Sequence, residues 1–191
     1  MRKAACVAAA VAGLTLAGAA AAGAQVFTPS FQAPRLSNEL GIYVSEDPLH
    51  LEGSWRRSFG GYGLGFRGGY SDAGDGALTL GVEYVNPLAL AGAPPIDVAL
   101  TAAGQVLVGD AEAFGAQVGL DFGYVFATPD LNIVPYIHPR LAIVDVGDEA
   151  DLEVLADVGV NLDFRPNLSF RFGANLGTGT DWGVGLAWRT R

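Results

Sequence analysis

The sequence is poor in cysteine, in basic residues and in long apolar runs. Its one cysteine, Cys6, lies within the first 24 residues, so a chain cleaved after them has no thiol. Disulfide bonds, thiol catalysis and cysteine-ligated zinc are then excluded. After residue 24 no stretch offers the roughly 18 uninterrupted apolar residues that a membrane-spanning helix needs. If this protein lies in a membrane, helices do not hold it there.

Residues 1–24 have the pattern of a secretory signal peptide. Arg2 and Lys3 precede the alanine-rich run ACVAAAVAGLTLAGAAAA, and Ala22-Gly23-Ala24 forms a small-x-small cleavage site. A retained membrane helix is the alternative, but the small residues that end the run disfavour it. We predict cleavage of this signal peptide and a mature chain that starts at Gln25.

The predicted mature chain is strongly acidic. Loss of Arg2 and Lys3 changes the balance from 11 basic against 20 acidic residues to 9 against 20, a net charge of −11. Such a chain repels nucleic acid, so we predict no nucleic-acid partner. The 167 residues that remain of 191 suit one domain.

Alternation of apolar and small or polar residues dominates the rest of the chain. In AFGAQVGLDFGYVF (113–126) and DLEVLADVGVNLDF (151–164), nearly every second residue is apolar, and Leu155 is the exception. A period of two is typical of β-strands. The same spacing predicts further strands at 61–70, 77–86, 97–108, 132–145, 168–176 and 181–189. Two weaker candidates at 38–45 and 49–57 raise the prediction from eight strands to ten.

The connections between these segments alternate in chemistry. Those at 71–76, 109–112, 147–151 and 177–181 are acidic and rich in glycine, whereas those at 86–95, 127–131 and 165–167 contain proline. SEDP (45–48) joins the acidic class by its position in the order, despite its proline. In an antiparallel meander, odd and even connections lie at opposite ends, so the predicted fold has an acidic-loop end and a proline-turn end.

The glycine content indicates which strand face meets water. A soluble sandwich or lipocalin-like barrel has its apolar residues inside, and a membrane barrel has them outside. Here 27 of 191 residues are glycine, roughly twice the usual share, and many fill the face opposite the apolar one. Small residues suit a crowded lumen. Aromatic residues also gather near both strand ends, like two interfacial girdles. We therefore predict an all-β fold: a closed antiparallel up-and-down transmembrane β-barrel of eight to ten strands.

With its signal peptide, short strands, girdles and last strand WGVGLAW (182–188), the sequence resembles the small outer-membrane β-barrel proteins of Gram-negative bacteria, of the OmpA transmembrane-domain, OmpX and OmpW kind. The resemblance implies an outer-membrane barrel domain at 38–191 after an N-terminal extension at 25–37. It also implies outer-membrane lipids and lipopolysaccharide as partners, the barrel-assembly machinery during biogenesis, and a monomer.

Three patterns could carry chemistry. GLGFRG (63–68) matches a dinucleotide-binding loop, but no helix follows it, so we interpret its glycines as lumen residues. His50, Glu52 and Ser54 share one strand face and have the composition of a hydrolytic site, although neighbours on that face lie about 7 Å apart. His138 could bind a metal together with His50, but two histidines without a placed carboxylate are weak evidence for a metal site. We predict no catalytic, cofactor-binding or metal-binding residue, and no cofactor.

We predict a non-enzymatic protein with an envelope-structural role, or one that binds small molecules or surfaces, and with a largely plugged lumen. A narrow channel or transporter for small or hydrophobic solutes and a lipid-modifying barrel enzyme remain as alternatives.

Hairpin geometry at 165–167 sets Asp163 opposite Ser169 and diagonal to Arg171, so we expect Asp163 and Arg171 to pair inside the barrel. Arg67 and Glu83 face inward by the same alternation.

Overall fold

The computed structural model describes residues 29–46, 49–72, 75–89, 96–109, 112–145, 150–164, 167–177 and 181–190. The predicted signal peptide, residues 1–24, lies outside these ranges. The elements are β1 (Glu39–Ser45), β2 (His50–Phe59), β3 (Tyr62–Ser71), β4 (Ala77–Pro87), β5 (Asp97–Gly109), β6 (Ala113–Gly123), β7 (Phe126–Ala127), β8 (Leu131–Asp145), β9 (Ala150–Phe164), β10 (Leu168–Leu176) and β11 (Asp181–Arg189).

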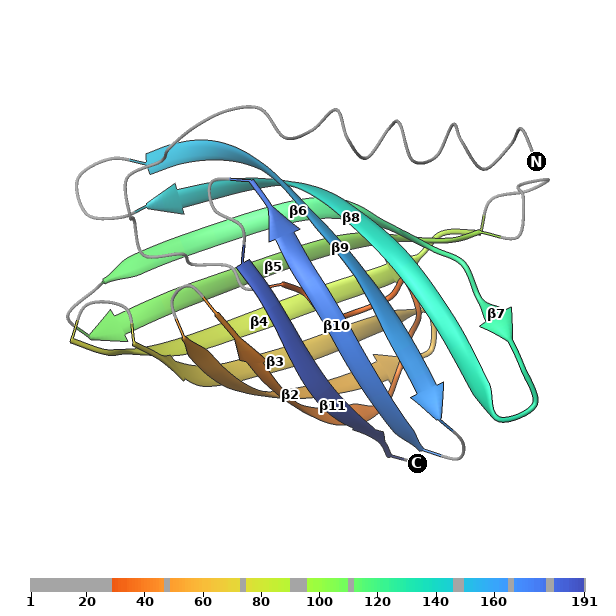
Figure 1. Ribbon diagram of the computed structural model, residues 1–191. Helices are drawn as coiled ribbons and strands as arrows, with labels where there is room; N and C mark the ends of the chain where they lie inside the picture. The colour runs from red at the N-terminus through yellow and green to blue at the C-terminus, as the bar shows by residue number, and fades with distance from the viewer. Residues whose placement is uncertain are drawn as a thin grey trace, which may run out of the picture.

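Ten of these strands form a closed antiparallel barrel (Figure 1). Each pairs with its neighbours in sequence, β1 pairs with β11, and β6 pairs with β8 to complete the ring. The predicted up-and-down barrel is thus confirmed, and the strand number is ten rather than eight. The strand predicted at 113–126 is shorter than expected, because β6 ends at Gly123 and β7 is a separate two-residue piece beside β8. No helix in the described ranges is long and apolar enough to cross a membrane.

The outer wall of the barrel is apolar. Every barrel strand exposes large hydrophobic side chains, for example Ile42, Leu51, Phe66, Leu80, Leu100, Val118, Leu141, Val154, Phe172 and Leu186. The tryptophans of the last strand, Trp182 and Trp188, also face outward. A soluble protein would hide such a continuous surface, so the polarity of this barrel suits lipid outside, as the sequence predicts.

The inner wall is largely polar, and alternation separates the two faces residue by residue. In β1 and β2 the buried and exposed positions alternate strictly through seven and eight residues respectively. One apolar cluster fills the lumen toward the acidic-loop end, namely Ala77, Leu107, Ala113, Ala142, Val144 and Leu155. Leu155, the exception in the sequence pattern, therefore has a place inside the barrel.

The hairpin of β9 and β10 has the register that the sequence predicts. Phe164 pairs with Leu168, and Asp163 pairs with Ser169. Because a shift of one residue would turn every side chain to the other face, this agreement fixes which residues of both strands point into the lumen.

Candidate functional site

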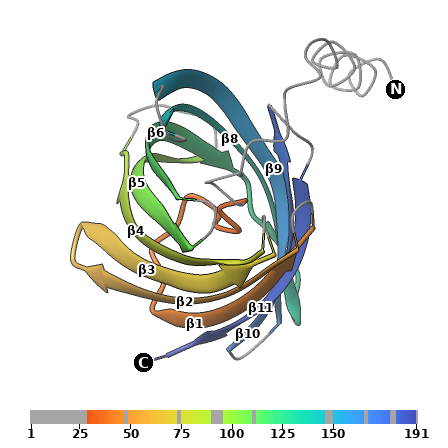
Figure 2. The same ribbon diagram turned by 90° about the vertical axis from the view of Figure 1, so that its left-hand side faces the viewer.

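The N-terminal segment Pro29–Pro34, here called the lumen segment, lies inside the barrel. Figure 2 shows it within the ring of strands. All six of its residues are buried. The described part of the predicted extension at 25–37 thus enters the lumen, a placement that its sequence does not predict.

Phe31 has an unusual backbone conformation within the lumen segment. Its φ of 50° lies in the left-handed region, which large side chains rarely adopt. Such strain persists only where surrounding contacts hold the residue. The Phe31 ring provides one of them, because it stacks on the inward-facing ring of Tyr43 with 4.7 Å between ring centroids and 16° between planes.

Three arginines of the inner wall bind the backbone of the lumen segment. Arg56, Arg67 and Arg171 come from β2, β3 and β10 and are all buried. They donate hydrogen bonds to three consecutive carbonyl oxygens: Arg67 to Pro29 at 3.2 Å, Arg56 to Ser30 at 2.8 Å, and Arg171 to Phe31 at 2.6 Å. The Ser30 N–H donates in turn to Asp157 Oδ2 at 3.2 Å. The wall therefore recognises the segment by its main chain.

Buried carboxylates neutralise these arginines. Arg171 pairs with Glu39 at 2.6 Å. Arg56 pairs with Glu39 at 3.1 Å and with Glu83 at 2.9 Å. Arg67 pairs with Glu52 at 2.7 Å and with Glu83 at 3.1 Å. The Tyr43 hydroxyl accepts further hydrogen bonds from Arg56 and Arg171. A connected network of this kind satisfies charges that would otherwise be costly inside a barrel.

The predicted pair of Asp163 with Arg171 is wrong, although the register behind it is right. Arg171 reaches across β11 to Glu39 on β1 instead. Asp163 is occupied nearer the proline-turn end, where it accepts a hydrogen bond from Ser169 at 2.7 Å and pairs with Arg189. The predicted inward placement of Arg67 and Glu83 is confirmed.

Glycines make room for the aromatic rings in the lumen. A Cβ atom added to Gly185 would collide with the Tyr43 ring, and one added to Gly183 would lie 2.6 Å from the Phe31 ring. At Gly173 the added atom would lie 3.3 Å from the same ring. The interpretation of glycine as a lumen residue is thus confirmed here. In GLGFRG, residues 63–68 lie entirely within β3, where Gly65 faces Glu83 and Arg56. For Gly68 the interpretation is wrong, because it lies on the outward face with Phe66 and Tyr70.

His50, Glu52 and Ser54 all point into the lumen from β2, as their spacing implies, but they do not contact one another in a hydrolytic arrangement. His50 Nε2 lies 2.8 Å from Thr79 Oγ1. Glu52 binds Arg67. His50 and Glu52 therefore bind different partners, on β4 and β3, and Ser54 Oγ has no hydrogen-bond partner among the described residues.

A different series of side chains comes together around His138. Thr101 Oγ1 on β5 lies 2.7 Å from His138 Nε2 on β8, and His138 Nδ1 lies 3.3 Å from Asp157 Oδ2 on β9. Asp157 also accepts a hydrogen bond from Arg140 at 2.7 Å. Sequence spacing could not suggest this series, because its members lie on three strands.

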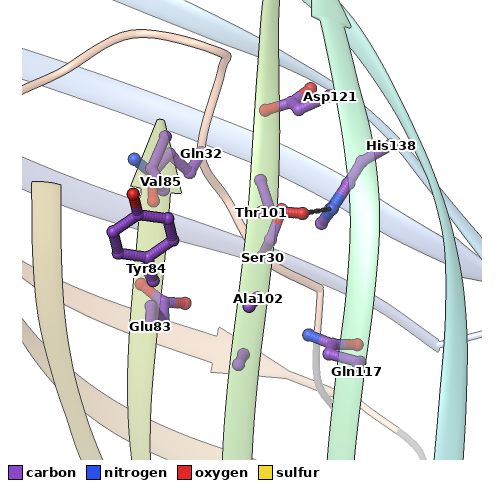
Figure 3. Close-up of a pocket in the computed structure, with 11 residues that line it drawn as sticks. Ser30, Gln32, Glu83, Tyr84, Val85, Thr101, Ala102, Gln117, Asp121 and His138 are labelled. Atoms are coloured by element: carbon purple, nitrogen blue, oxygen red, sulfur yellow. Dashed lines mark hydrogen bonds between the residues drawn. The ribbon is translucent and has the colours of Figure 1, made fainter. Parts of the chain in front are cut away.

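Thr101 and His138 line a small pocket beside the lumen segment. Ser30 and Gln32 of the segment line it together with wall residues such as Glu83, Gln117 and Asp121 (Figure 3). Within the described ranges, no three His, Asp or Glu side chains form a group that could hold a metal ion. His50 and His138 each lie within hydrogen-bond distance of a threonine, Thr79 and Thr101 respectively.

No protein-family model matches the chain, and no curated protein matches it. Solved structures do. The chain is similar to the β domain of the Bordetella autotransporter Brka, with a TM-score of 0.55, 16% identity, and coverage of 79% of this chain and 75% of that one.

A second similar structure is a KdgM porin, with a TM-score of 0.48, 10% identity, and coverage of 80% of this chain and 99% of that one. A third is LpxR from Salmonella typhimurium, with a TM-score of 0.44, 13% identity, and coverage of 85% of this chain and 80% of that one. At these identities, likeness concerns the fold alone. The ten-stranded barrel with its apolar outer wall has the fold of the β-barrel proteins of bacterial outer membranes. Membership of the OmpA, OmpX and OmpW kind stays a prediction.

Proposed function

We propose that this protein is a closed, non-enzymatic barrel of the Gram-negative outer membrane, with an envelope-structural or surface-binding role. The apolar outer wall supports insertion in lipid. The predicted signal peptide supports export. Outer-membrane lipids and lipopolysaccharide are its proposed partners, the barrel-assembly machinery inserts it, and it acts as a monomer.

One observation supports a closed barrel. The lumen segment crosses the interior, where an open pore would need a water-filled path. Barrels of eight strands have an interior that side chains just fill, and ten strands add modest room. Here that room holds Phe31, Tyr43 and the arginine network. The apolar cluster around Leu155 fills the acidic-loop end. A narrow transporter, the alternative function, would need a continuous path past both the lumen segment and the apolar cluster.

Planar-bilayer recording tests the closed state. We expect purified full-length protein, inserted in lipid, to show no large steady conductance. A mobility shift on gels between boiled and unboiled samples must first show that the barrel is intact. Closed barrels give this shift because their backbone groups are paired. Porin-like current steps from the wild type would reject this function. Recovery as a detergent-free soluble monomer would reject the membrane location.

A second candidate, a lipid-modifying acyl hydrolase, is favoured by one specific observation: the series Thr101, His138 and Asp157. Hydroxyl, imidazole and carboxylate in this order are the groups used for acyl transfer. Thr101 Oγ1 would attack an ester carbonyl while His138 takes its proton. The imidazolium would return that proton to the leaving alcohol, and water would then hydrolyse the acyl-threonine.

Ester hydrolysis by the folded protein separates the two candidates. For the enzyme, p-nitrophenyl esters would be cleaved by the wild type and by Thr101→Ser, and not by Thr101→Val, which keeps the shape of the side chain. No cleavage by the wild type, or equal cleavage by Thr101→Val, would reject the enzyme and leave the first proposal.

A further inference from the structure

We propose that the lumen contains a binding site for a polypeptide segment with an aromatic side chain, and that the lumen segment is its resident ligand. This inference rests on the proposed closed state and explains how that state is maintained. Removal of the segment would leave a vacant site that a peptide of the same sequence can enter.

The contacts of the wall with the lumen segment are those of a receptor with a ligand. Three consecutive carbonyl oxygens, of Pro29, Ser30 and Phe31, accept hydrogen bonds from arginines, and one N–H, of Ser30, donates to Asp157. These contacts address the main chain, so they suit polypeptide as a chemical class. Charged donors and acceptors make each of them stronger than a neutral hydrogen bond.

The segment is bound to the barrel without being part of its sheet. Within the described ranges, its only backbone–backbone hydrogen bond is local, from Arg35 N–H to the Ala33 carbonyl at 2.6 Å. The strands, in contrast, are joined by continuous ladders, such as β8 with β9. The segment could therefore leave the lumen while all ten strand pairings remain.

Specificity comes from the aromatic ring. Phe31 is 1% exposed, stacks on Tyr43, and lies against Gly173 and Gly183. A Cβ atom at Gly183 would collide with the ring, and one at Gly173 would crowd it. The site therefore favours an aromatic residue at this position of the bound chain, and an acidic residue there would bury a carboxylate in place of the stacked ring, at a cost in free energy.

The test uses full-length protein with Phe31→Asp, which we expect to expel the lumen segment because its carboxylate would be buried, and which changes no residue of the wall. The probe is a fluorescein-labelled peptide PSFQAPR, the sequence of residues 29–35, followed by anisotropy in detergent. Phe31→Tyr is the matched control, because it keeps the stacked ring. A labelled PSDQAPR peptide is the control for the probe.

We expect saturable binding of PSFQAPR to Phe31→Asp, at least tenfold tighter than to the wild type or to Phe31→Tyr, and at least tenfold tighter than that of PSDQAPR. Equal binding to all three proteins would overturn the inference, as would no binding to a Phe31→Asp barrel that is intact by its heat-dependent gel shift. If that variant does not fold, Phe31→Ala is judged by the same criteria. Conductance of the wild type would reject the closed state separately, whatever the peptide does.

Discussion

Replacement of Arg171 by alanine should be among the most damaging changes to this barrel. The substitution removes the ion pair with Glu39 at 2.6 Å and two hydrogen bonds, to the Phe31 carbonyl at 2.6 Å and the Tyr43 hydroxyl at 3.1 Å. Glu39 is 0% exposed, so it cannot recover its lost partner from water.

The expected magnitude follows from this burial. Loss of one partner of a buried ion pair costs about 3 to 5 kcal/mol. Glu39 keeps Arg56 at 3.1 Å, which favours the lower part of that range. We therefore expect the free energy of unfolding to fall by about 3 kcal/mol. Arg35→Ala is the matched control, because Arg35 pairs with Asp97 at 2.7 Å but the two side chains are 49% and 40% exposed. An exposed pair of this kind contributes about 0 to 1 kcal/mol.

Urea unfolding in lipid vesicles, followed by tryptophan fluorescence, measures both variants against the wild type. Trp55, Trp182 and Trp188 all lie on the outer wall and report loss of lipid contact. If Arg171→Ala and Arg35→Ala differ by less than about 1 kcal/mol, the arginine network does not stabilise the barrel, and the reasoning fails.

Two further predictions concern the topology and the packing. The predicted mature chain has no other thiol. A cysteine at Ala150 at the acidic-loop end should react with a membrane-impermeant maleimide in whole cells, whereas one at Asp130 at the proline-turn end should react only after lysis. The reverse result would invert the predicted orientation. Gly185→Ala should lower the free energy of unfolding by about 1 to 3 kcal/mol, since its new methyl group meets the ring of Tyr43, while Gly104→Ala, whose nearest neighbour lies 3.8 Å away, should be close to neutral. Equal urea midpoints for these two variants would show that the lumen tolerates more volume than the structure allows.

Strand positions and facing could be predicted from the sequence because they depend on local rules. A period of two distinguishes the faces, and a short hairpin connection fixes register, so Asp163 was matched to Ser169 correctly. The partner of Arg171 could not be found in this way. Glu39 is 132 residues away, and the two meet only because β1 pairs with β11 in the closed ring.

The lumen segment had no signal of its own in the sequence. PSFQAP contains two prolines and no strand or helix periodicity, so it is typical of an extension. An indirect signal was present in Gly183 of β11, which leaves space that the Phe31 ring of the segment fills. The Thr101 and His138 contact was missed for a related reason, since same-strand spacing drew attention to His50, Glu52 and Ser54, while function in a barrel is assembled across strands.

Cysteine protection at Ser30 tests most directly whether the lumen segment closes the barrel. Ser30 is 7% exposed, and its main chain is bound by both Arg56 and Asp157, so Ser30→Cys is a near-isosteric probe inside the lumen. We expect this thiol in the folded barrel to react with a water-soluble maleimide at least a hundredfold more slowly than a cysteine at Ala150, and at the same rate once the protein is unfolded. Reaction of the folded protein as fast as that of the exposed Ala150 site would contradict the closed lumen.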